Sequence, residues 1–336
     1  MLKLAKVVVV GGGTGGVVAA NVLRKTLKKE HKVVLIDRNQ NHVFYGTIPL
    51  LNINRRKPQN LQRNLSRLNN KGIDFVQAEV TGIDYELSKV LTTLEPVSYD
   101  YLVLSPGAEH HPETVPGFNE IAYNAYSLKG ANQLRQNLKD FVGGKIVVFI
   151  SSLPFSCPPA PYEITFLLDD YLRNRGIRNQ TEIYLITPEP SPEPLAEPKV
   201  GGSIREMLNE RDINYYSEAK VLSIDPLKQK LILDQGVTIP GDYFIGIPSH
   251  WGPNFLRNTF LSEEGGWIKV DPNTLQTKIK NIFAIGDATN IRLPINKVWA
   301  PKAGIFAHYQ AEVVARNLSR LISRQKPNYS YTAKGM

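Results

Sequence analysis

Three glycines near the amino terminus have the spacing of a nucleotide-binding loop. Gly11, Gly13 and Gly16 fit the pattern G-x-G-x-x-G between a buried apolar run, residues 5–10, and an expected helix over residues 17–28. In such a loop the first glycine makes the turn, the second lets the backbone approach a pyrophosphate, and the third lets helix and strand pack closely. The pyrophosphate would lie at the positive end of the helix.

An acidic residue stands where the ribose of a dinucleotide requires it. Asp37 follows a second apolar run, residues 32–36, and lies 21 residues beyond Gly16. A carboxylate at this position accepts hydrogen bonds from a ribose diol and repels a 2′-phosphate, which argues against NADP. The loop, the helix and this acid together predict a dinucleotide-binding βαβ unit, but they do not distinguish FAD from NAD.

A second motif, late in the chain, distinguishes the two nucleotides. Gly286 and Asp287 follow the apolar run 282–285, which places a carboxylate just after a buried strand. With this motif and the glycine loop, the chain resembles the flavoproteins with two dinucleotide-binding domains, the class of glutathione reductase, over nearly its whole length. In that class the Asp of an x-x-G-D segment holds the ribityl chain of FAD. The resemblance therefore implies FAD as the cofactor.

The same resemblance implies the other residues of the FAD site. Ser105 and Gly107 occupy the short turn at which such chains cross between domains, and Val80 ends a strand, expected over 74–80, whose backbone faces the adenine. Covalent-flavin members carry a cysteine near the position of Pro49, and this chain has none there, so FAD is expected to be bound non-covalently. The implied cofactor-binding residues are Gly11, Gly13, Thr14, Gly16, Asp37, Arg38, Pro49, Val80, Ser105, Gly107, Gly286, Asp287, Lys302, Ala303 and Gly304.

The second domain lacks the phosphate loop that NADH-using members of the class repeat there. Its first strand is expected over 145–150, and the following residues, 151–159, contain no glycine. Pro154, Pro158 and Pro159 remove backbone donors and fix φ, so a pyrophosphate could not lie close to this backbone. We therefore expect NAD(P)H to bind poorly.

A cysteine takes the place of the missing loop. Cys157, followed by prolines and by Glu163, resembles the sulfide-oxidising branch of the class, which contains sulfide:quinone oxidoreductases and the flavoprotein subunit of flavocytochrome c sulfide dehydrogenase. The segment 301–304, Pro-Lys-Ala-Gly, resembles the other signature of that branch, whose amides point at the flavin edge where negative charge develops. The resemblance implies Cys157 beside the flavin and Lys302 as a nearby cation. Glu163 is either a general base or an acid favoured at a helix amino terminus.

The chain departs from that branch because Cys157 is its only cysteine. In the family two cysteines work together, and the second lies near the carboxyl terminus, beyond the last helix. Whether this partner and a membrane-docking tail are missing by truncation or by nature stays open. A thiol at the start of a helix has a lowered pKa and could form a persulfide alone. The alternative is a buried, inert cysteine.

Composition sets limits on the partners. The 336 residues suggest two domains, and the net charge of +9 fits a phosphate-bearing cofactor, an anionic substrate, an anionic membrane face or simple solubility. The positive charge is spread out, so we expect no nucleic-acid partner. Without a long apolar segment or a signal peptide, we expect a cytoplasmic protein, with contact to the inner face of the membrane left open. No spacing of His, Cys and Asp predicts a metal site, and His110 and His111 are interpreted as surface residues.

Three further segments carry structural expectations. Residues 58–72 predict a helix with Leu61, Leu65 and Leu68 on one face, and residues 302–324 predict a long helix. The segment 188–198 contains five prolines and is expected to be extended and stiff.

The predicted fold is α/β, with two Rossmann-like dinucleotide-binding-type domains. Residues 1–116 and 265–325 are expected to form a discontinuous FAD domain, residues 117–264 a second domain without an NAD phosphate loop, and residues 326–336 a tail. The predicted enzyme oxidises sulfide or a related sulfur compound through Cys157 and FAD, with catalytic contributions from Lys302 and Glu163, and passes electrons to a quinone or a cytochrome. The alternatives are a type II NADH:quinone dehydrogenase-like flavoenzyme and a partner-dependent electron-transfer flavoprotein subunit. The oligomeric state stays open.

Overall fold

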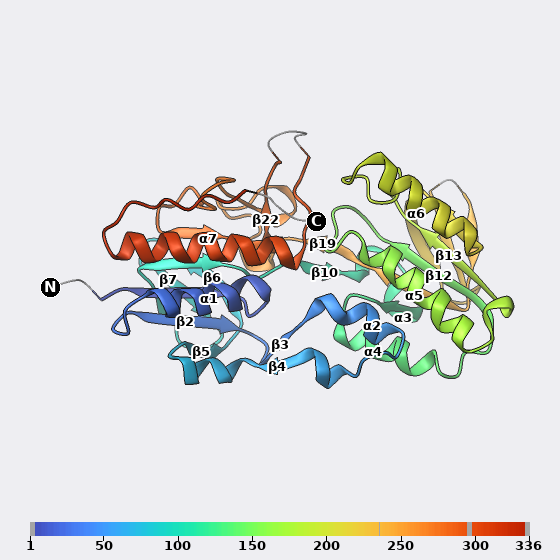
Figure 1. Ribbon diagram of the computed structural model, residues 1–336, viewed down its shortest axis with the longest axis horizontal. Coiled ribbons are helices and arrows are strands. Elements are labelled where there is room, and N and C mark those ends of the chain that lie inside the picture. Colours follow the sequence, from blue (N-terminus) through green and yellow to red (C-terminus); the bar gives the residue numbers. More distant parts are fainter. Residues whose placement is uncertain (1–3, 235, 294–297, 333–336) are drawn as a thin grey trace. The chain divides into compact units, whose positions relative to one another are not determined.

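A computed structural model of the chain describes residues 4–234, 236–293 and 298–332. The chain forms two compact units (Figure 1). The first unit comprises residues 1–43, 62–109 and 251–336, and the second comprises residues 44–61 and 110–250. The first unit is therefore discontinuous, because the chain leaves it and returns.

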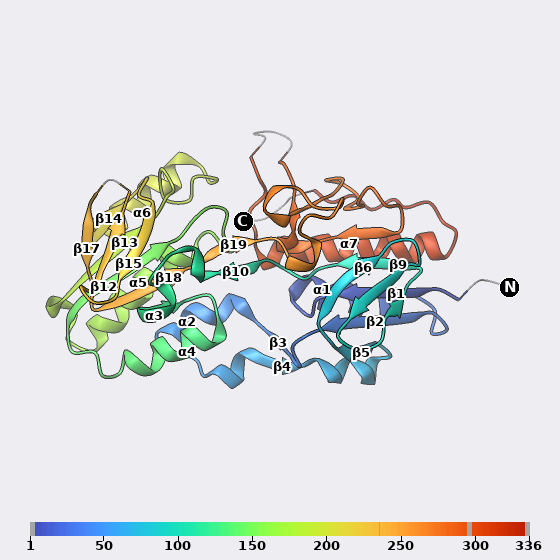
Figure 2. The ribbon, with the colours of Figure 1, turned by 180° about the vertical axis from the view of Figure 1, so that it is seen from behind.

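The first unit is built on a parallel sheet with the strand order β21-β9-β1-β2-β5, of which Figure 2 labels β9, β1, β2 and β5. These strands are β1 (Lys6–Val10), β2 (Lys32–Asp37), β5 (Asp74–Gln77), β9 (Tyr101–Leu104) and β21 (Ile282–Ala284). Helices α1 (Thr14–Thr26) and α7 (Gly304–Ile322) lie side by side against it, and the hydroxyls of Thr26 and Ser319 are 2.5 Å apart. The continuous apolar runs of β1 and β2 are typical of strands that are buried on both faces.

Shorter strands complete the first unit. The antiparallel sheet of β6 (Val80–Asp84), β7 (Lys89–Thr92) and β8 (Val97–Ser98) contributes to the same core through Val90. Two strand pairs are β3 (Asn41–Val43) with β4 (Gln62–Asn64), and β20 (Ile268–Lys269) with β22 (Thr289–Asn290). Two connecting strands, β10 (Glu109–His111) and β19 (Ser249–Trp251), pair where the chain passes between the units.

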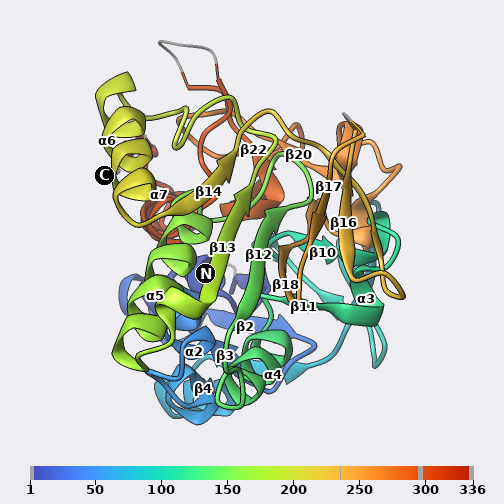
Figure 3. The ribbon, with the colours of Figure 1, turned by 90° about the vertical axis from the view of Figure 1, so that its right-hand side faces the viewer.

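The second unit repeats the parallel plan with the strand order β11-β18-β12-β13-β14 (Figure 3). Its strands are β11 (Ala122–Asn124), β12 (Gly144–Ile150), β13 (Thr181–Ile186), β14 (Ile213–Tyr216) and β18 (Tyr243–Ile247). The alternation of side chains along β12 separates two cores. Val148 packs in one core with residues of α4 (Leu128–Asn137), α5 (Ala160–Asn174) and α6 (Pro198–Glu210). Phe149 packs in the other core with residues of α3 (Phe118–Ile121), β15 (Val221–Asp225), β16 (Lys230–Leu233) and β17 (Thr238–Pro240).

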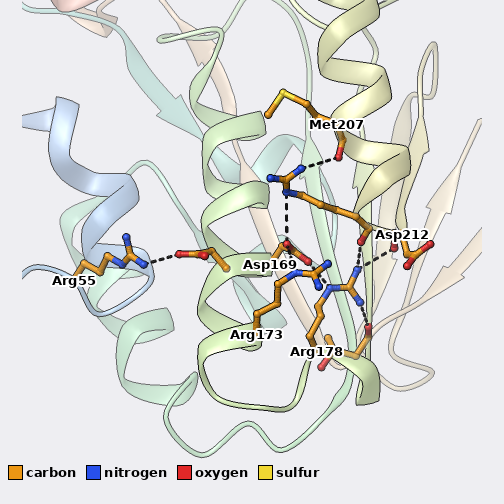
Figure 4. Close-up of polar contacts among 9 residues, drawn as sticks. Arg55, Asp169, Arg173, Arg178, Met207 and Asp212 are labelled. Atoms are coloured by element: carbon orange, nitrogen blue, oxygen red, sulfur yellow. Dashed lines mark hydrogen bonds and ion pairs between the residues drawn. The ribbon is translucent and has the colours of Figure 1, made fainter.

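A buried carboxylate anchors α5 in the second unit (Figure 4). Asp169 is 2% exposed and accepts hydrogen bonds from Nε of Arg178 (2.5 Å) and Nε of Arg173 (2.8 Å), with Nε of Arg211 at 3.7 Å. Arg178 also donates to the carbonyls of Thr181 and Asp212. The cluster therefore joins α5 to the start of β13 and to the end of α6.

Two predicted elements are wrong. The helix expected over 58–72 is instead two short 3-10 helices, Pro58–Leu61 and Leu65–Lys71, separated by β4, although Gly72 does end the segment in the left-handed conformation (φ +75°). The pairing of β4 with β3 overrides the helical spacing of the leucines. The proline-rich segment is bent rather than extended, and Glu193 has φ +48° and accepts a turn hydrogen bond from Ala196 N (2.9 Å).

The limits of the units also differ from the expected domain boundaries. The chain passes between the units at residues 109–110 and 250–251, and the segment 44–61, with α2 (Ile48–Asn52), belongs to the second unit. Tertiary packing explains this placement. Ile53 is 1% exposed within the core of the second unit, and Asn52 Nδ2 donates to Ala125 O (3.3 Å).

Candidate functional site

The glycine loop of the first unit has the geometry that its spacing predicts. Gly11 has φ +104°, and a methyl group at this position would lie 2.1 Å from the carbonyl oxygen of Ser105. A methyl group at Gly16 would lie 1.8 Å from the carbonyl oxygen of Gly11. At Gly13, by contrast, it would meet no atom within 4 Å. Packing requires the first and third glycines, and the middle one faces open space.

Asp37 lies against this loop. Its Oδ2 accepts a hydrogen bond from Gly12 N (2.5 Å), and its Oδ1 accepts one from Asn39 N (2.6 Å). These two bonds hold the carboxylate at the end of β2, beside the loop. The neighbouring Arg38 is exposed and lies 3.8 Å from Glu79. Asp37 is thus placed to accept hydrogen bonds from a hydroxylated ligand in the loop, whereas Arg38 reaches the surface.

Two more predicted residues of the first unit, Ser105 and Gly286, lie close to the glycine loop. A methyl group at Gly15 would lie 2.6 Å from Oγ of Ser105, and one at Gly286 would lie 3.9 Å from the same atom. Gly286 N donates to Oε1 of Gln310 (2.6 Å), which fixes the turn that carries Asp287 to α7. The last strand of the sheet and α7 therefore meet the loop.

The amino termini of α1 and α7 also meet here. A methyl group at Gly304, the first residue of α7, would lie 3.6 Å from Oγ1 of Thr14, the first residue of α1. Neither of these helices has an acidic residue in its own first turn. Gly107, with φ +76°, faces open space, as Gly13 does. Two helix amino termini beside open glycines fit an anionic, pyrophosphate-bearing cofactor such as FAD.

Lys302 is buried just before α7. Its Nζ donates to the backbone carbonyls of Asp287 (2.8 Å) and Thr289 (3.0 Å), and lies 3.7 Å from the centroid of the Trp267 ring. Burial lowers the pKa of Lys302 to about 8, against the raising effect of the Asp287 carboxylate. The ammonium group fixes the backbone at Asp287 and lines a small recess with Gly286 and Ala303.

Two of the predicted cofactor residues belong to elements other than the parallel sheet of the first unit and its loops. Val80 does not end the strand of the central sheet, because β5 ends at Gln77 and Val80 begins β6. Ala78 N donates to Asp37 O (3.0 Å) at the point where the chain leaves the sheet. Pro49 lies in α2, buried in the second unit, so the first unit does not contain it.

The second unit gathers polar side chains at one edge of its parallel sheet. Tyr126 follows β11, His250 follows β18, Cys157 follows β12, and Glu189 and Glu193 follow β13. These four strands are neighbours in the sheet, so their carboxyl ends meet along one edge. In open α/β sheets this edge is where ligands bind.

Cys157 is held in a constrained backbone conformation at this edge. It has φ +54°, which is unusual for a residue with a side chain. Its carbonyl oxygen accepts hydrogen bonds from the Tyr126 hydroxyl (3.0 Å) and from Ala160 N (2.9 Å), and Ala160 begins α5. The residue is half-buried. The backbone of Cys157 therefore lies directly before the amino terminus of α5.

Two histidines contact Tyr126. The ring centroids of His250 and Tyr126 are 5.8 Å apart, and those of His110 and His250 are 4.5 Å apart. Nδ1 of His250 lies 2.8 Å from Pro248 O, which only accepts, so the neutral ring carries its proton on Nδ1. The interpretation of His110 and His111 as surface residues is wrong: His110 is half-buried, and His111 is buried with Nδ1 2.6 Å from Glu113.

Three carboxyl groups lie near Tyr126. Glu189 is 3% exposed and accepts hydrogen bonds from the hydroxyls of Tyr162 (2.7 Å) and Thr187 (3.1 Å), and burial raises its pKa. Glu193 is 7% exposed, and burial, together with the charge of Glu189, raises its pKa to about 7. Glu163, in the first turn of α5, is exposed, but partial burial of its carboxyl group still raises its pKa.

Sequence reasoning named Cys157 and Glu163 but missed Tyr126, His250, Glu189 and Glu193. One signal in the sequence could have indicated the last four. Each of them follows a strand of a parallel sheet within a few residues, and such positions share an edge. The strand order that makes these particular ends neighbours is not visible in the sequence.

The chain is similar in sequence to known oxidoreductases. The family model of pyridine nucleotide-disulphide oxidoreductases matches residues 5–311. Mitochondrial sulfide:quinone oxidoreductase of Mus musculus is 26% identical over 97% of this chain and 73% of its own length. A type II NADH:quinone oxidoreductase of Staphylococcus aureus is 22% identical over 98% of this chain and 86% of its own length.

The chain is also similar in structure to a solved sulfide:quinone oxidoreductase. The crystal structure of the sulfide:quinone oxidoreductase from Aquifex aeolicus superposes with a TM-score of 0.86 and 26% identity, covering 95% of this chain and 77% of that one. The predicted fold class, the flavin-dependent enzyme class, FAD as cofactor and the resemblance to the sulfide:quinone oxidoreductase branch are thereby confirmed. Within the described residues, no helix is long and apolar enough to span a bilayer, and no group of His, Cys, Asp and Glu could hold a metal ion.

Proposed function

Because the chain belongs to the family of pyridine nucleotide-disulphide oxidoreductases, we propose that it oxidises sulfide, or a related sulfur compound, and passes the electrons to a quinone. Its relatives in the sulfide:quinone oxidoreductase branch support this choice of substrate and acceptor. A cytochrome is the alternative acceptor. FAD, when bound, supplies a two-electron acceptor between the sulfur compound and the quinone.

The observation that carries the proposal is the position of Cys157. In the second unit it occupies the carboxyl end of β12, where an NADH-using enzyme needs a glycine-rich phosphate loop. Residues 151–159 contain no glycine, and Tyr126 holds the backbone of Cys157 in place. This arrangement favours sulfur chemistry over the type II NADH dehydrogenase alternative, because it offers a nucleophile and no glycine-rich loop whose backbone could closely approach a pyrophosphate.

The first unit provides the residues that would hold FAD. The amino termini of α1 and α7 would neutralise the pyrophosphate, and Asp37 would accept hydrogen bonds from the ribose. Asp287 would bind the ribityl chain, and Lys302 would place a positive charge near it. With no cysteine in this unit, FAD would be held non-covalently.

A single thiol is sufficient for the proposed reaction. The thiolate of Cys157 and a hydrosulfide ion would form an S–S bond and give an anionic persulfide, with the release of one proton and two electrons, for which FAD, when bound, would be the acceptor. A second hydrosulfide ion would then attack the outer sulfur and carry it away as the hydrodisulfide ion, HS2⁻, which restores the Cys157 thiolate. Atoms and charge balance in both steps without a second cysteine. Glu163, six residues beyond Cys157 in the first turn of α5, is one candidate base.

A quinone that is dissolved in a membrane requires the protein to reach the lipid surface. The net charge of +9 favours contact with anionic lipids, so we propose a peripheral position on the inner face of the membrane.

Anaerobic absorbance spectroscopy tests the proposed function. The FAD-loaded protein is mixed with sulfide in one cuvette and with NADH in another. Sulfide is expected to bleach the flavin bands, and Cys157→Ser and Cys157→Ala are both expected to abolish the bleaching while FAD stays bound. Bleaching by NADH alone would show an NADH dehydrogenase. Bleaching by neither compound would favour a flavoprotein subunit that depends on a partner.

A further inference from the structure

Gly12, inside the glycine loop, is held on three sides by other residues of the first unit. Its N–H donates to Oδ2 of Asp37 (2.5 Å), and its carbonyl oxygen lies 2.8 Å from Nδ1 of His42. A methyl group at Gly12 would lie 2.6 Å from Cδ1 of Leu65. Both backbone polar groups of Gly12 are therefore fixed, and His42 is a partner that the glycine pattern does not predict.

His42 is the donor in its contact with this carbonyl. A carbonyl oxygen only accepts hydrogen bonds, so Nδ1 of the His42 ring carries the proton. His42 is the middle residue of β3, and the pairing of β3 with β4 places it opposite Arg63. The residue is half-buried. A paired strand therefore carries the donor and fixes the direction from which it reaches the loop.

The bond to His42 fixes the direction of the next N–H group along the chain. A trans peptide unit is planar, and its C=O and N–H point to opposite sides. Because Gly12 O faces His42, the N–H of Gly13 faces away from His42. Glycine on both sides of this peptide gives it little steric resistance to a flip. The hydrogen bond from His42 therefore supplies a restraint on its orientation that the two glycines do not provide.

We propose that His42 is a positioning residue for the pyrophosphate of FAD. It holds the Gly12–Gly13 peptide in the orientation that leaves the Gly13 N–H available to a phosphate oxygen. Gly13 suits this role, because a methyl group there would meet no atom within 4 Å and a ligand can approach its backbone closely. The inference goes beyond the proposed function, because it concerns the binding of FAD whatever compound reduces the flavin.

Titration of the full-length protein with FAD tests this role. His42→Leu removes the donor, and we expect the Kd for FAD to rise by about fivefold to tenfold. His42→Asn keeps a donor, because its Nδ2 lies as many bonds from the backbone as Nδ1 of histidine, and its Kd should stay within about twofold of the wild-type value. His31→Leu is the matched control. Nδ1 of His31 accepts from Ala5 N (3.0 Å) just before β1, so this variant should melt at a lower temperature and bind FAD normally.

Hydrogen exchange shows whether the effect acts through the peptide. In the wild-type protein, saturating FAD should slow amide exchange in the segment 11–17, which contains the Gly13 N–H. In His42→Leu this protection should be smaller, even when FAD saturates the protein. In His42→Asn it should be close to that of the wild type.

Three results would overturn the inference: an unchanged Kd in His42→Leu, an equal rise in His42→Asn, or an equal rise in His31→Leu. If His42→Leu does not fold without FAD, His42→Gln replaces it, because its amide lies one carbon farther from the backbone. Equal affinities of His42→Asn and His42→Gln would then contradict the role of the donor. Neither sulfide nor NADH enters these measurements, so their outcome does not depend on the proposed reaction.

Discussion

The hydroxyl of Tyr126 donates a hydrogen bond of 3.0 Å to the backbone carbonyl of Cys157, and so joins the end of β11 to the loop that follows β12. Burial and the negative charges of Cys157 and the nearby carboxyl groups raise the pKa of Tyr126 well above its usual value. The hydroxyl therefore stays protonated and remains a donor whatever the state of the thiol. Tyr126 acts on the backbone of Cys157, which makes it a positioning residue.

Replacing Tyr126 by Phe removes this bond but leaves Ala160 N on the same carbonyl. We expect a loss of about 1 kcal/mol in the free energy of unfolding. In this variant only one hydrogen bond to the carbonyl of Cys157 is left to hold its backbone at φ +54°. We therefore also expect a changed pH profile of Cys157 alkylation. Urea unfolding and iodoacetamide labelling measure the two effects. A variant with unchanged labelling would show that Tyr126 only stabilises the fold.

Gly13 in the glycine loop is expected to matter for FAD binding but not for folding. Gly13→Ala should fold normally, since the new methyl group meets no atom of the protein within 4 Å, yet it should weaken FAD binding by roughly tenfold or more, because the backbone no longer approaches the pyrophosphate closely. Flavin fluorescence titration measures the affinity, and thermal melting without FAD measures the fold. Gly202→Ala, at an equally open position in α6, serves as the control and should bind FAD normally. Equal affinities for both variants would contradict a pyrophosphate at Gly13.

Two adjacent aspartates on α5 differ in their burial and in the number of arginines that they pair with. Asp169 is 2% exposed among three guanidinium groups, whereas the Asp170 side chain is 54% exposed and pairs with Arg55 at 2.6 Å (Figure 4). Asp169→Ala leaves Arg178 buried without its carboxylate and should cost about 3–5 kcal/mol. Asp170→Ala should cost less than about 1 kcal/mol. Urea unfolding followed by circular dichroism compares them, and similar losses would mean that burial of the cluster does not matter.

Glu193 should make stability depend on pH. Its pKa of about 7 in the folded protein lies above the ordinary value of 4.5, so the folded state binds a proton that the unfolded state has lost between these pH values. The contribution of Glu193 is therefore fully present below about pH 4.5 and is lost as the pH rises through about 7. Glu193→Gln should match the wild type at low pH and be more stable by up to about 3 kcal/mol at pH 8. A difference that does not change with pH would contradict the raised pKa.

Local patterns in the sequence were sufficient to predict much of the structure of the first unit. The spacing of Gly11, Gly13 and Gly16 and the position of Asp37 predict the loop and its acid, because turn geometry and strand length are decided over short stretches of chain. The helix over 302–324 and the strand over 145–150 were likewise found close to their observed bounds, Gly304–Ile322 and Gly144–Ile150. The same reasoning failed at residues 58–72, where the pairing of β4 with β3 overrides the helical spacing of the leucines.

The site in the second unit was decided by tertiary structure. Cys157 and Glu163 could be named from the sequence, since they lie six residues apart on one loop and helix. Tyr126, His250 and Glu193 come from segments far apart in the chain, and they share an edge only because β11, β18, β12 and β13 are neighbours in the sheet. Strand order depends on how distant segments pack. The sequence by itself therefore identified Cys157 as the candidate thiol. Only the packing of the strands determined which groups surround it.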